Sequence, residues 1–345
     1  MDLSIAGILL LDGVTNGAIY ALLGVATVLL FAVTRVLFIP QGEYVAFAAL
    51  TVGLFQTGEV PGSVWFLLFL AGAAALLDLV EDLRARRKAA AIARRALRTL
   101  AFPIVISALA VWLAPQKPSL LVQALLTLGL VTPFGPLIYR LAFQSLAEAS
   151  VLALLIVSVG VHFALVGLGL FFFGAEGFRN PSFWDARFSL GAVSVSGQAI
   201  IIVAVTLALI VMLWLFFERT LHGKALRATA VNQLGARLMG ISSRTSGRLS
   251  FTMAAFIGAL SGLLIGPTTT IFYDSGFLIG LKGFVAAVFA GLSSYPGAMA
   301  GALIVGLVEA FGSFWASAFK EVIVFTFILP IIFWRSLTDP HVDED

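Results

Sequence analysis

Long apolar stretches recur along the chain and are separated by short polar connections. The first covers about residues 5–33, and comparable stretches lie at 151–173 and 199–217. A helix needs roughly 17–25 apolar residues to cross a lipid bilayer, and fewer where surrounding protein shields it. Only 11% of the residues are charged, whereas soluble domains contain about one quarter. The chain is therefore predicted to be an integral membrane protein.

The number of apolar stretches predicts an all-α, polytopic membrane protein with about 10–11 transmembrane or half-membrane helices. Short stretches such as 43–55 and 281–292 would cross part of the bilayer or be shielded by neighbouring helices. No soluble segment is long enough to bury a core of its own, so residues 1–345 are expected to form a single transmembrane domain. The remaining predicted segments are 64–77, 101–114, 120–138, 249–267, 298–315 and 322–334.

A basic segment at 218–248 separates two of these stretches. It holds a single acid, Glu218, among six Lys and Arg residues. Such a segment can be a solvated loop, lie in the headgroup layer or fit a groove on a partner protein. Its length and its Ala/Gly-rich stripe favour docking. Apolar residues spaced by three and four predict one short amphipathic helix here: Leu226, Ala230, Leu234, Leu238 and Ile241.

A second charged segment lies at 78–98. Asp78, Glu81 and Asp82 come first, and seven Lys and Arg residues follow. This order suits a helix macrodipole and predicts a cytoplasmic or interfacial helix, which would anchor the topology or recruit anionic lipid. Positive loops stay on the cytoplasmic side of a membrane. Both segments are therefore expected to face the cytoplasm, with the N-terminus outside and the C-terminus inside.

The sequence lacks the motifs of several chemical classes. It has no cysteine, and its three histidines lie far apart, so disulfides, metal sites and cofactors are not expected. No G-x-x-x-x-G-K-[ST], H-E-x-x-H or G-x-S-x-G pattern occurs, so the chain is not expected to be an enzyme, and any ATP hydrolysis would belong to another chain. The pI of about 9.4 reflects the basic loops, not nucleic-acid binding. Residues 1–7 lack the basic region of a cleavable signal peptide.

Several glycines have the spacing that allows helices to approach closely. Gly258, Gly262 and Gly266 form two overlapping small-xxx-small patterns on one face, and Gly297 and Gly301 form another. Helix packing is the main interpretation. A pore-lining role for some of these glycines is the alternative.

Ionisable groups inside apolar stretches are costly and are often functional. Glu43 opens a short stretch after a Pro-containing break, and Glu309 and His162 lie within later stretches. Each would line a translocation pathway or gate, or make a satisfied interhelical hydrogen bond. Asp12, Asp274 and Lys282 lie near predicted membrane edges. An interfacial position would explain Asp274 and Lys282.

Several segments resemble the permease subunits of branched-chain (hydrophobic) amino acid ABC importers, specifically the Liv-type subunit. The match covers about 1–55 and 139–318, and 218–310 is its most specific part. The segments that carry it are 16–22 (NGAIYAL), 35–44 (RVLFIPQGEY), 139–143 (YRLAF), 227–241, 250–262, 283–298 (GFVAAVFAGLSSYPGA) and 306–310 (GLVEA).

The chain departs from the family pattern in three places. Gln41 stands where the family usually has His, and the preceding Phe38-Ile39-Pro40 replaces Asn-Phe-Ala. Gln144-Ser145 replaces an expected Arg-Pro. Residues 78–118 look like an insertion.

The resemblance implies an ABC importer permease fold, in a single permease domain in a bacterial inner membrane, that moves branched-chain amino acids or similar small organic solutes into the cytoplasm. The implied partners are two ABC ATPase subunits, a second, related permease subunit or a second copy, a periplasmic solute-binding protein and the lipid bilayer. Segment 218–248 would be the cytoplasmic coupling loop, a peg that converts ATPase closure into helix motion. Its contact residues would be Lys224, Arg227, Asn232, Arg237, Leu238 and Gly240, and the translocation pathway would include Gln41, Glu43, His162 and Glu309.

Two other classes of function fit the residues. An ion-coupled secondary transporter would relay protons through Glu43, His162 or Glu309 and would need no ATPase. A membrane scaffold or assembly factor would use 78–98 and 218–248 only as docking surfaces.

Overall fold

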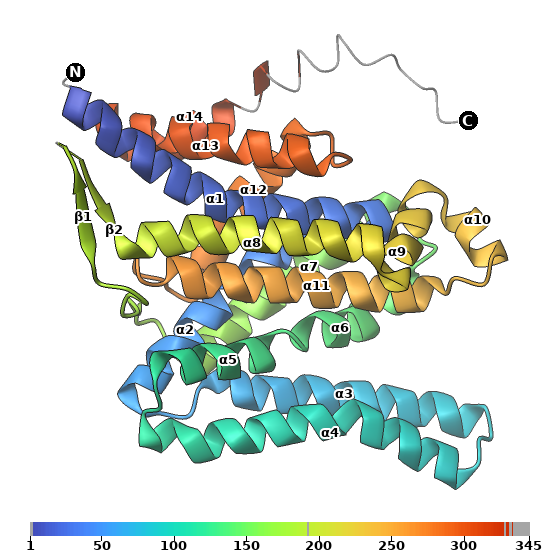
Figure 1. The fold of residues 1–345 in the computed structure, drawn as a ribbon. Helices are drawn as coiled ribbons and strands as arrows, with labels where there is room; N and C mark the ends of the chain where they lie inside the picture. Colours follow the sequence, from blue (N-terminus) through green and yellow to red (C-terminus); the bar gives the residue numbers. More distant parts are fainter. Residues whose placement is uncertain (1–2, 192, 328, 331–332, 334–345) are drawn as a thin grey trace.

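Helix α1 (Leu3–Thr34) runs through the middle of the molecule, and the other long helices lie beside it along a common axis (Figure 1). The computed structural model describes residues 3–191, 193–327, 329–330 and 333. Over these residues, eight helical segments are long and apolar enough to cross a membrane. Besides α1 they comprise α3 (Gly62–Arg84), α4 (Ala89–Leu113), α5 (Leu120–Val131) with α6 (Phe134–Ile138), α7 (Val151–Phe173), α8 (Gly197–Arg219), α11 (Ser243–Ile265) and α13 (Tyr295–Trp315).

Shorter helices complete the bundle. These are α2 (Glu43–Thr57), α12 (Ser275–Phe289) and α14 (Lys320–Thr326). The prediction of an all-α, polytopic membrane protein with long and half-length helices is confirmed. The last predicted segment, 322–334, starts within α14, and its residues 328, 331–332 and 334 lie outside the described residues.

The chain breaks sharply between α1 and α2. Arg35 has a positive φ of 59°, and a short 3-10 turn covers Ile39–Gly42. A Cβ atom on Gly42 would lie 1.8 Å from the carbonyl oxygen of Gly276, so only glycine fits against α12 here. Helix α2 is buried from Glu43 to Phe55. Because protein surrounds it, a helix of 15 residues suffices at this place.

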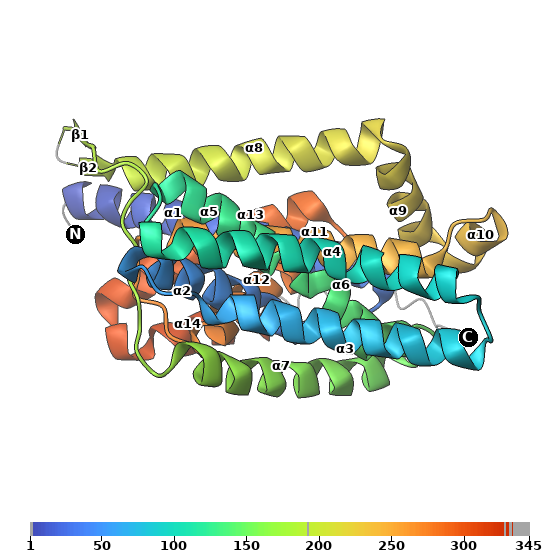
Figure 2. The ribbon, with the colours of Figure 1, turned by 90° about the horizontal axis from the view of Figure 1, so that it is seen from below.

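The two ends of the bundle carry different structures. The described N-terminal end of α1 lies beside the antiparallel hairpin of β1 (Arg187–Leu190) and β2 (Val193–Ser196), which belongs to the connection between α7 and α8. The opposite end holds α9 (Leu221–Val231), α10 (Gln233–Leu238) and the turn between α3 and α4 (Figures 1 and 2). Both basic segments therefore lie at one end of the molecule, which we call the basic end. The other end carries the hairpin of β1 and β2, and we call it the hairpin end. The α3–α4 turn does not lie there.

Segment 78–98 does not form the separate helix that its charge order predicted. Its acids lie in the last turns of α3, its later bases lie in α4, and the chain reverses between them at Arg86, whose φ is 49°. The apolar stretches 64–77 and 101–114 are the remaining parts of the same two helices. The charge pattern thus marks two helix ends that extend past their apolar parts.

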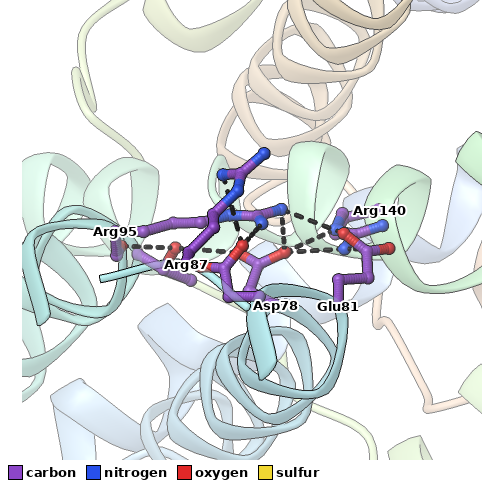
Figure 3. Close-up of polar contacts among 7 residues, drawn as sticks. Asp78, Glu81, Arg87, Arg95 and Arg140 are labelled. Carbon is purple, nitrogen blue, oxygen red and sulfur yellow. Dashed lines mark hydrogen bonds and ion pairs between the residues drawn. The ribbon is translucent and has the colours of Figure 1, made fainter. Parts of the chain in front are cut away.

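An ion-pair network joins the α3–α4 hairpin to the rest of the bundle (Figure 3). Arg95 of α4 and Arg140, just after α6, converge on Asp78 of α3, with N–O distances of 2.6 and 2.7 Å. Arg95 also lies 2.6 Å from Asp82, and Arg140 lies 2.7 Å from Glu81. Because Asp78 and Asp82 are buried, both depend on these cations for compensation.

Glycines mark the places where helices touch most closely. A Cβ atom on Gly262 would lie 2.3 Å from the carbonyl oxygen of Val45, and one on Gly258 would lie 2.8 Å from the Cβ of Tyr44, where α11 meets α2. A Cβ on Gly266 would lie 2.4 Å from Asn180 Nδ2. A Cβ on Gly297 would lie 2.8 Å from the Cβ of Ala290, just after α12, and one on Gly301 would lie 2.8 Å from the Cβ of Phe289, the last residue of α12.

We predict that Arg140→Met destabilises the protein by about 2–3 kcal/mol, because it removes charge-assisted hydrogen bonds from the buried Asp78. The melting temperature of the purified protein in mild detergent measures this. Arg98→Met is the matched control, since Arg98 is exposed on α4 and makes no ion pair within the described residues. Equal melting temperatures for the two variants would show that the network does not hold the hairpin.

Candidate functional site

The basic segment 218–248 folds as two short helices, and not as the single helix predicted. Asn232 separates them with extended backbone, φ −151° and ψ 100°, and its Oδ1 accepts a 2.8 Å hydrogen bond from the N–H of Gly235. This side chain therefore caps α10 and ends the continuity of the segment. The apolar stripe is divided as a result: Leu226 of α9 is buried against the bundle, while Leu234 and Leu238 of α10 are exposed.

The tip of this segment presents apolar side chains to its surroundings. Leu238 and Met239 are 80% and 83% exposed, and Val231 and Leu234 are also largely exposed. Single exposed apolar residues are ordinary, but several exposed apolar residues within one short segment are typical of an interaction site. We call Val231, Leu234, Leu238 and Met239 the apolar tip.

Polar contacts fix the apolar tip to the bundle. The Gln233 side chain donates a 2.8 Å hydrogen bond to the carbonyl of Val33, at the end of α1. The Arg237 guanidinium lies 2.7 Å from Glu148 and also donates to Ser243 at the start of α11. Side-chain hydrogen bonds therefore connect α10 to α1 and α11.

The other residues predicted for coupling lie around this connection. Arg227 pairs with Glu218 on the surface. Lys224 is exposed on α9. Gly240 has a φ of 86°, which ends α10 in the left-handed region that favours glycine.

A cavity of about 1010 Å³ lies at the hairpin end, the end opposite the apolar tip. Its lining comes from the first half of α1, the 179–199 connection, the 265–282 region and residues 309–321. The lining holds as many acids as bases, so the cavity is formally neutral. The charged residues are Asp12, Asp185, Glu309, Glu321, Arg179, Arg187, Lys282 and Lys320.

Four of the lining residues form a polar cluster, in which the Glu321 side chain is the most exposed, at 32%. Lys282 Nζ lies 2.5 Å from Glu309 Oε1 and 3.1 Å from Glu321 Oε1. The Tyr20 hydroxyl donates a 2.5 Å hydrogen bond to Glu309 Oε2. The side chains of Lys282 and Glu309 are only 6% and 9% exposed. We call Tyr20, Lys282, Glu309 and Glu321 the Lys282 cluster.

The other residues predicted for the pathway lie elsewhere. Glu43 is fully buried, and its carboxylate is 3.1 Å from His162 Nδ1. The His162 ring lies 4.8 Å from the ring of Phe277, on α12. Gln41 donates a 2.9 Å hydrogen bond to the carbonyl of Ala254 on α11. Of the four predicted pathway residues, Glu309 lines the cavity, and Gln41, Glu43 and His162 do not.

Sequence reasoning placed Lys282 at a membrane edge and did not single out Tyr20 or Glu321. The apolar stretch was expected to begin at 281, whereas α12 begins at Ser275 and carries Lys282 at its middle. A usable signal was present in the glycine spacing, because Gly276 and Gly280 extend the close-packing pattern to residues before the lysine.

Comparison with known proteins agrees with this architecture. Residues 9–333 match the family described as "Branched-chain amino acid transport system / permease component". The chain is 30% identical to the high-affinity branched-chain amino acid transport system permease protein BraD of Pseudomonas aeruginosa, over 70% of this chain and 82% of that protein. It is 29% identical to the permease protein LivH of Escherichia coli, over 59% of this chain and 68% of LivH.

Among solved structures, PsaBC from Streptococcus pneumoniae in complex with Fab aligns with a TM-score of 0.40 and 12% identity, over 93% of this chain and 90% of that one. The match to the family over nearly the whole length, together with BraD and LivH, confirms the resemblance to Liv-type subunits. The chain therefore belongs to the family of permease components of branched-chain amino acid transport systems and is a multi-pass membrane permease of an ABC importer.

Proposed function

We propose that this permease imports branched-chain amino acids or closely similar small organic solutes, and that the apolar tip is where an ATPase subunit docks. The observation that carries the proposal is the exposed apolar tip, which hydrogen bonds connect to α1 and α11. The chain has no P-loop motif of its own, so ATP would be hydrolysed on two separate ATPase subunits.

The distribution of charge supports one orientation in the membrane. The bases of 84–98 and of 219–248 lie at the basic end, and Lys and Arg are retained on the cytoplasmic side. The basic end would then face the cytoplasm, and the hairpin end would face the periplasm. The N-terminus would be outside. The C-terminus, predicted to be inside, lies beyond the described residues.

This orientation gives each end a partner. A periplasmic solute-binding protein would deliver solute near the 174–198 connection, next to the cavity. A second, related permease, or a second copy of this chain, would complete the pathway. ATPase closure would push on α10, and the contacts of Gln233 and Arg237 would pass the displacement to α1 and α11 in a hinge-like movement.

The other predicted site residues take roles that follow from their positions. Glu309 would contact the pathway directly, because it lines the cavity. Gln41, Glu43 and His162 lie at the break before α2 and near α12, so they would reach the pathway only when α12 moves. Segment 78–118, which holds the end of α3 and all of α4, would be a peripheral part of a single permease domain.

We predict that Leu238→Asp prevents the ATPase from co-purifying with the tagged permease in mild detergent, because it places a charge in the apolar docking surface. Ala85→Asp is the matched control: Ala85 is exposed at the same end, in the α3–α4 turn. Retention of the ATPase by Leu238→Asp, at the level seen with the control, would rule out the apolar tip as its docking site.

We also predict that Arg237→Glu lowers ATP-dependent uptake by about tenfold or more while leaving the protein folded, because an exposed ion pair contributes little to stability but this one positions α10. The Glu148→Arg/Arg237→Glu variant restores the pair with exchanged charges and should recover much of the uptake, measured with radiolabelled L-leucine in proteoliposomes. If uptake does not depend on ATP, or survives Arg237→Glu unchanged, the coupling assignment is wrong.

A further inference from the structure

The Lys282 cluster joins four separate elements at the wall of the cavity. Tyr20 belongs to α1, Lys282 to α12, Glu309 to α13 and Glu321 to α14. Charges inside a membrane protein are costly unless they are paired. Within the cluster one lysine faces two glutamates, and outside it Lys320 Nζ lies 3.9 Å from Glu321 Oε1, too far for a hydrogen bond.

One acceptor in the cluster is free. Glu321 Oε2 is buried and has no hydrogen-bond partner among the described residues. A buried carboxylate oxygen without a donor is unfavourable, so an additional N–H donor would stabilise the site. A cationic donor suits it best, because the acceptor is a carboxylate oxygen and hydrogen bonds between charged groups are the stronger ones.

The cluster also keeps donors for an anion. Lys282 Nζ has three N–H donors, of which two are directed at Glu309 and Glu321. In this structure the Tyr20 hydroxyl donates to Glu309. If a group of the ligand donated to Glu309 instead, the Tyr20 hydroxyl would be free to donate to another acceptor. A ligand that brings an ammonium and a carboxylate on neighbouring atoms satisfies both halves of the cluster.

The surroundings favour a neutral ligand with an apolar part. The balanced charges of the cavity lining give no net attraction for an anion or a cation. Leu278 and Phe314 line the same cavity, and they are 43% and 49% exposed. They offer an apolar surface close to the cluster.

We propose that the Lys282 cluster binds the headgroup of a zwitterionic α-amino acid, with the ammonium on Glu321 and Glu309 and the carboxylate on Lys282 and the Tyr20 hydroxyl. The apolar side chain of the ligand lies toward Leu278 and Phe314. This inference rests on the proposed function, because it takes the cavity as the entrance of the solute. It assigns amino-acid recognition to the permease itself, in addition to the solute-binding protein.

The test is saturation-transfer NMR on the complete permease–ATPase complex in nanodiscs, without the solute-binding protein. The probes are L-leucine, leucinamide, which lacks the carboxylate, and 4-methylpentanoate, which lacks the ammonium. L-leucine should give a strong signal, and the two analogues should bind about tenfold more weakly, since each loses charge-assisted hydrogen bonds.

Glu321→Gln should lose the L-leucine signal, whereas Asp185→Asn should keep it, because Asp185 lies in the same cavity lining outside the cluster. Lys282→Met/Glu309→Gln removes both members of the 2.5 Å pair together, and Glu321, whose side chain is 32% exposed, keeps Lys320 at 3.9 Å. This variant should remain assembled with the ATPase and lose the signal too.

The inference is overturned if Glu321→Gln binds L-leucine as the unaltered protein does, or if either analogue matches L-leucine. It is also overturned if the unaltered complex gives no L-leucine signal but takes up L-leucine when ATP and the solute-binding protein are supplied. In that case the proposed function still stands. Absence of ATP-dependent uptake by the unaltered complex with every amino acid supplied would overturn the proposed function and the inference with it.

Discussion

Backbone-to-backbone contact around α12 is the constraint on which the rest of the structure depends. Helices in lipid gain little from apolar burial, so they associate through close packing. Gly276 and Gly280 of α12 touch Gly42 at the break before α2, and Gly283 lies against Leu23 of α1. The short α12 is thereby held between α1 and the break, and its lysine is directed toward α13. The same packing thus sets the helix arrangement and builds the wall of the cavity.

Buried charge is used in two different ways in this bundle. At the basic end, Asp78 is shared by Arg95 and Arg140, and every charge in that network serves to hold the α3–α4 hairpin in place. Near the cavity, Lys282 faces two carboxylates, and Glu321 Oε2 has no hydrogen-bond partner within the part of the chain that the structure describes. A saturated network stabilises a fold, whereas an unsaturated one beside a cavity is suited to a ligand. The difference supports a structural role for the first and a binding role for the second.

Hydropathy was enough to predict the fold class, because the backbone in lipid has few alternatives to helices. Hydropathy and periodicity could not predict three other features. Periodicity predicted one helix through 226–241, but the Asn232 side chain caps α10 and breaks it, a local hydrogen bond that outweighs the pattern. The pairing of Asp78 with Arg140 joins residues far apart in sequence. Glu309 was singled out as an intramembrane acid, but Lys282 was not seen as its partner, because the helix that carries it starts before the apolar stretch.

The most direct test of the account is the sidedness of two positions at opposite ends of the bundle. The chain has no cysteine, so Ser313→Cys in the cavity and Leu238→Cys in the apolar tip each introduce a single thiol for a membrane-impermeant maleimide. The account predicts that Ser313→Cys is labelled only from the periplasmic side, and that Leu238→Cys is labelled only from the cytoplasmic side and is protected by bound ATPase. Labelling of Ser313→Cys from the cytoplasm, or unprotected labelling of Leu238→Cys in the assembled complex, would contradict it.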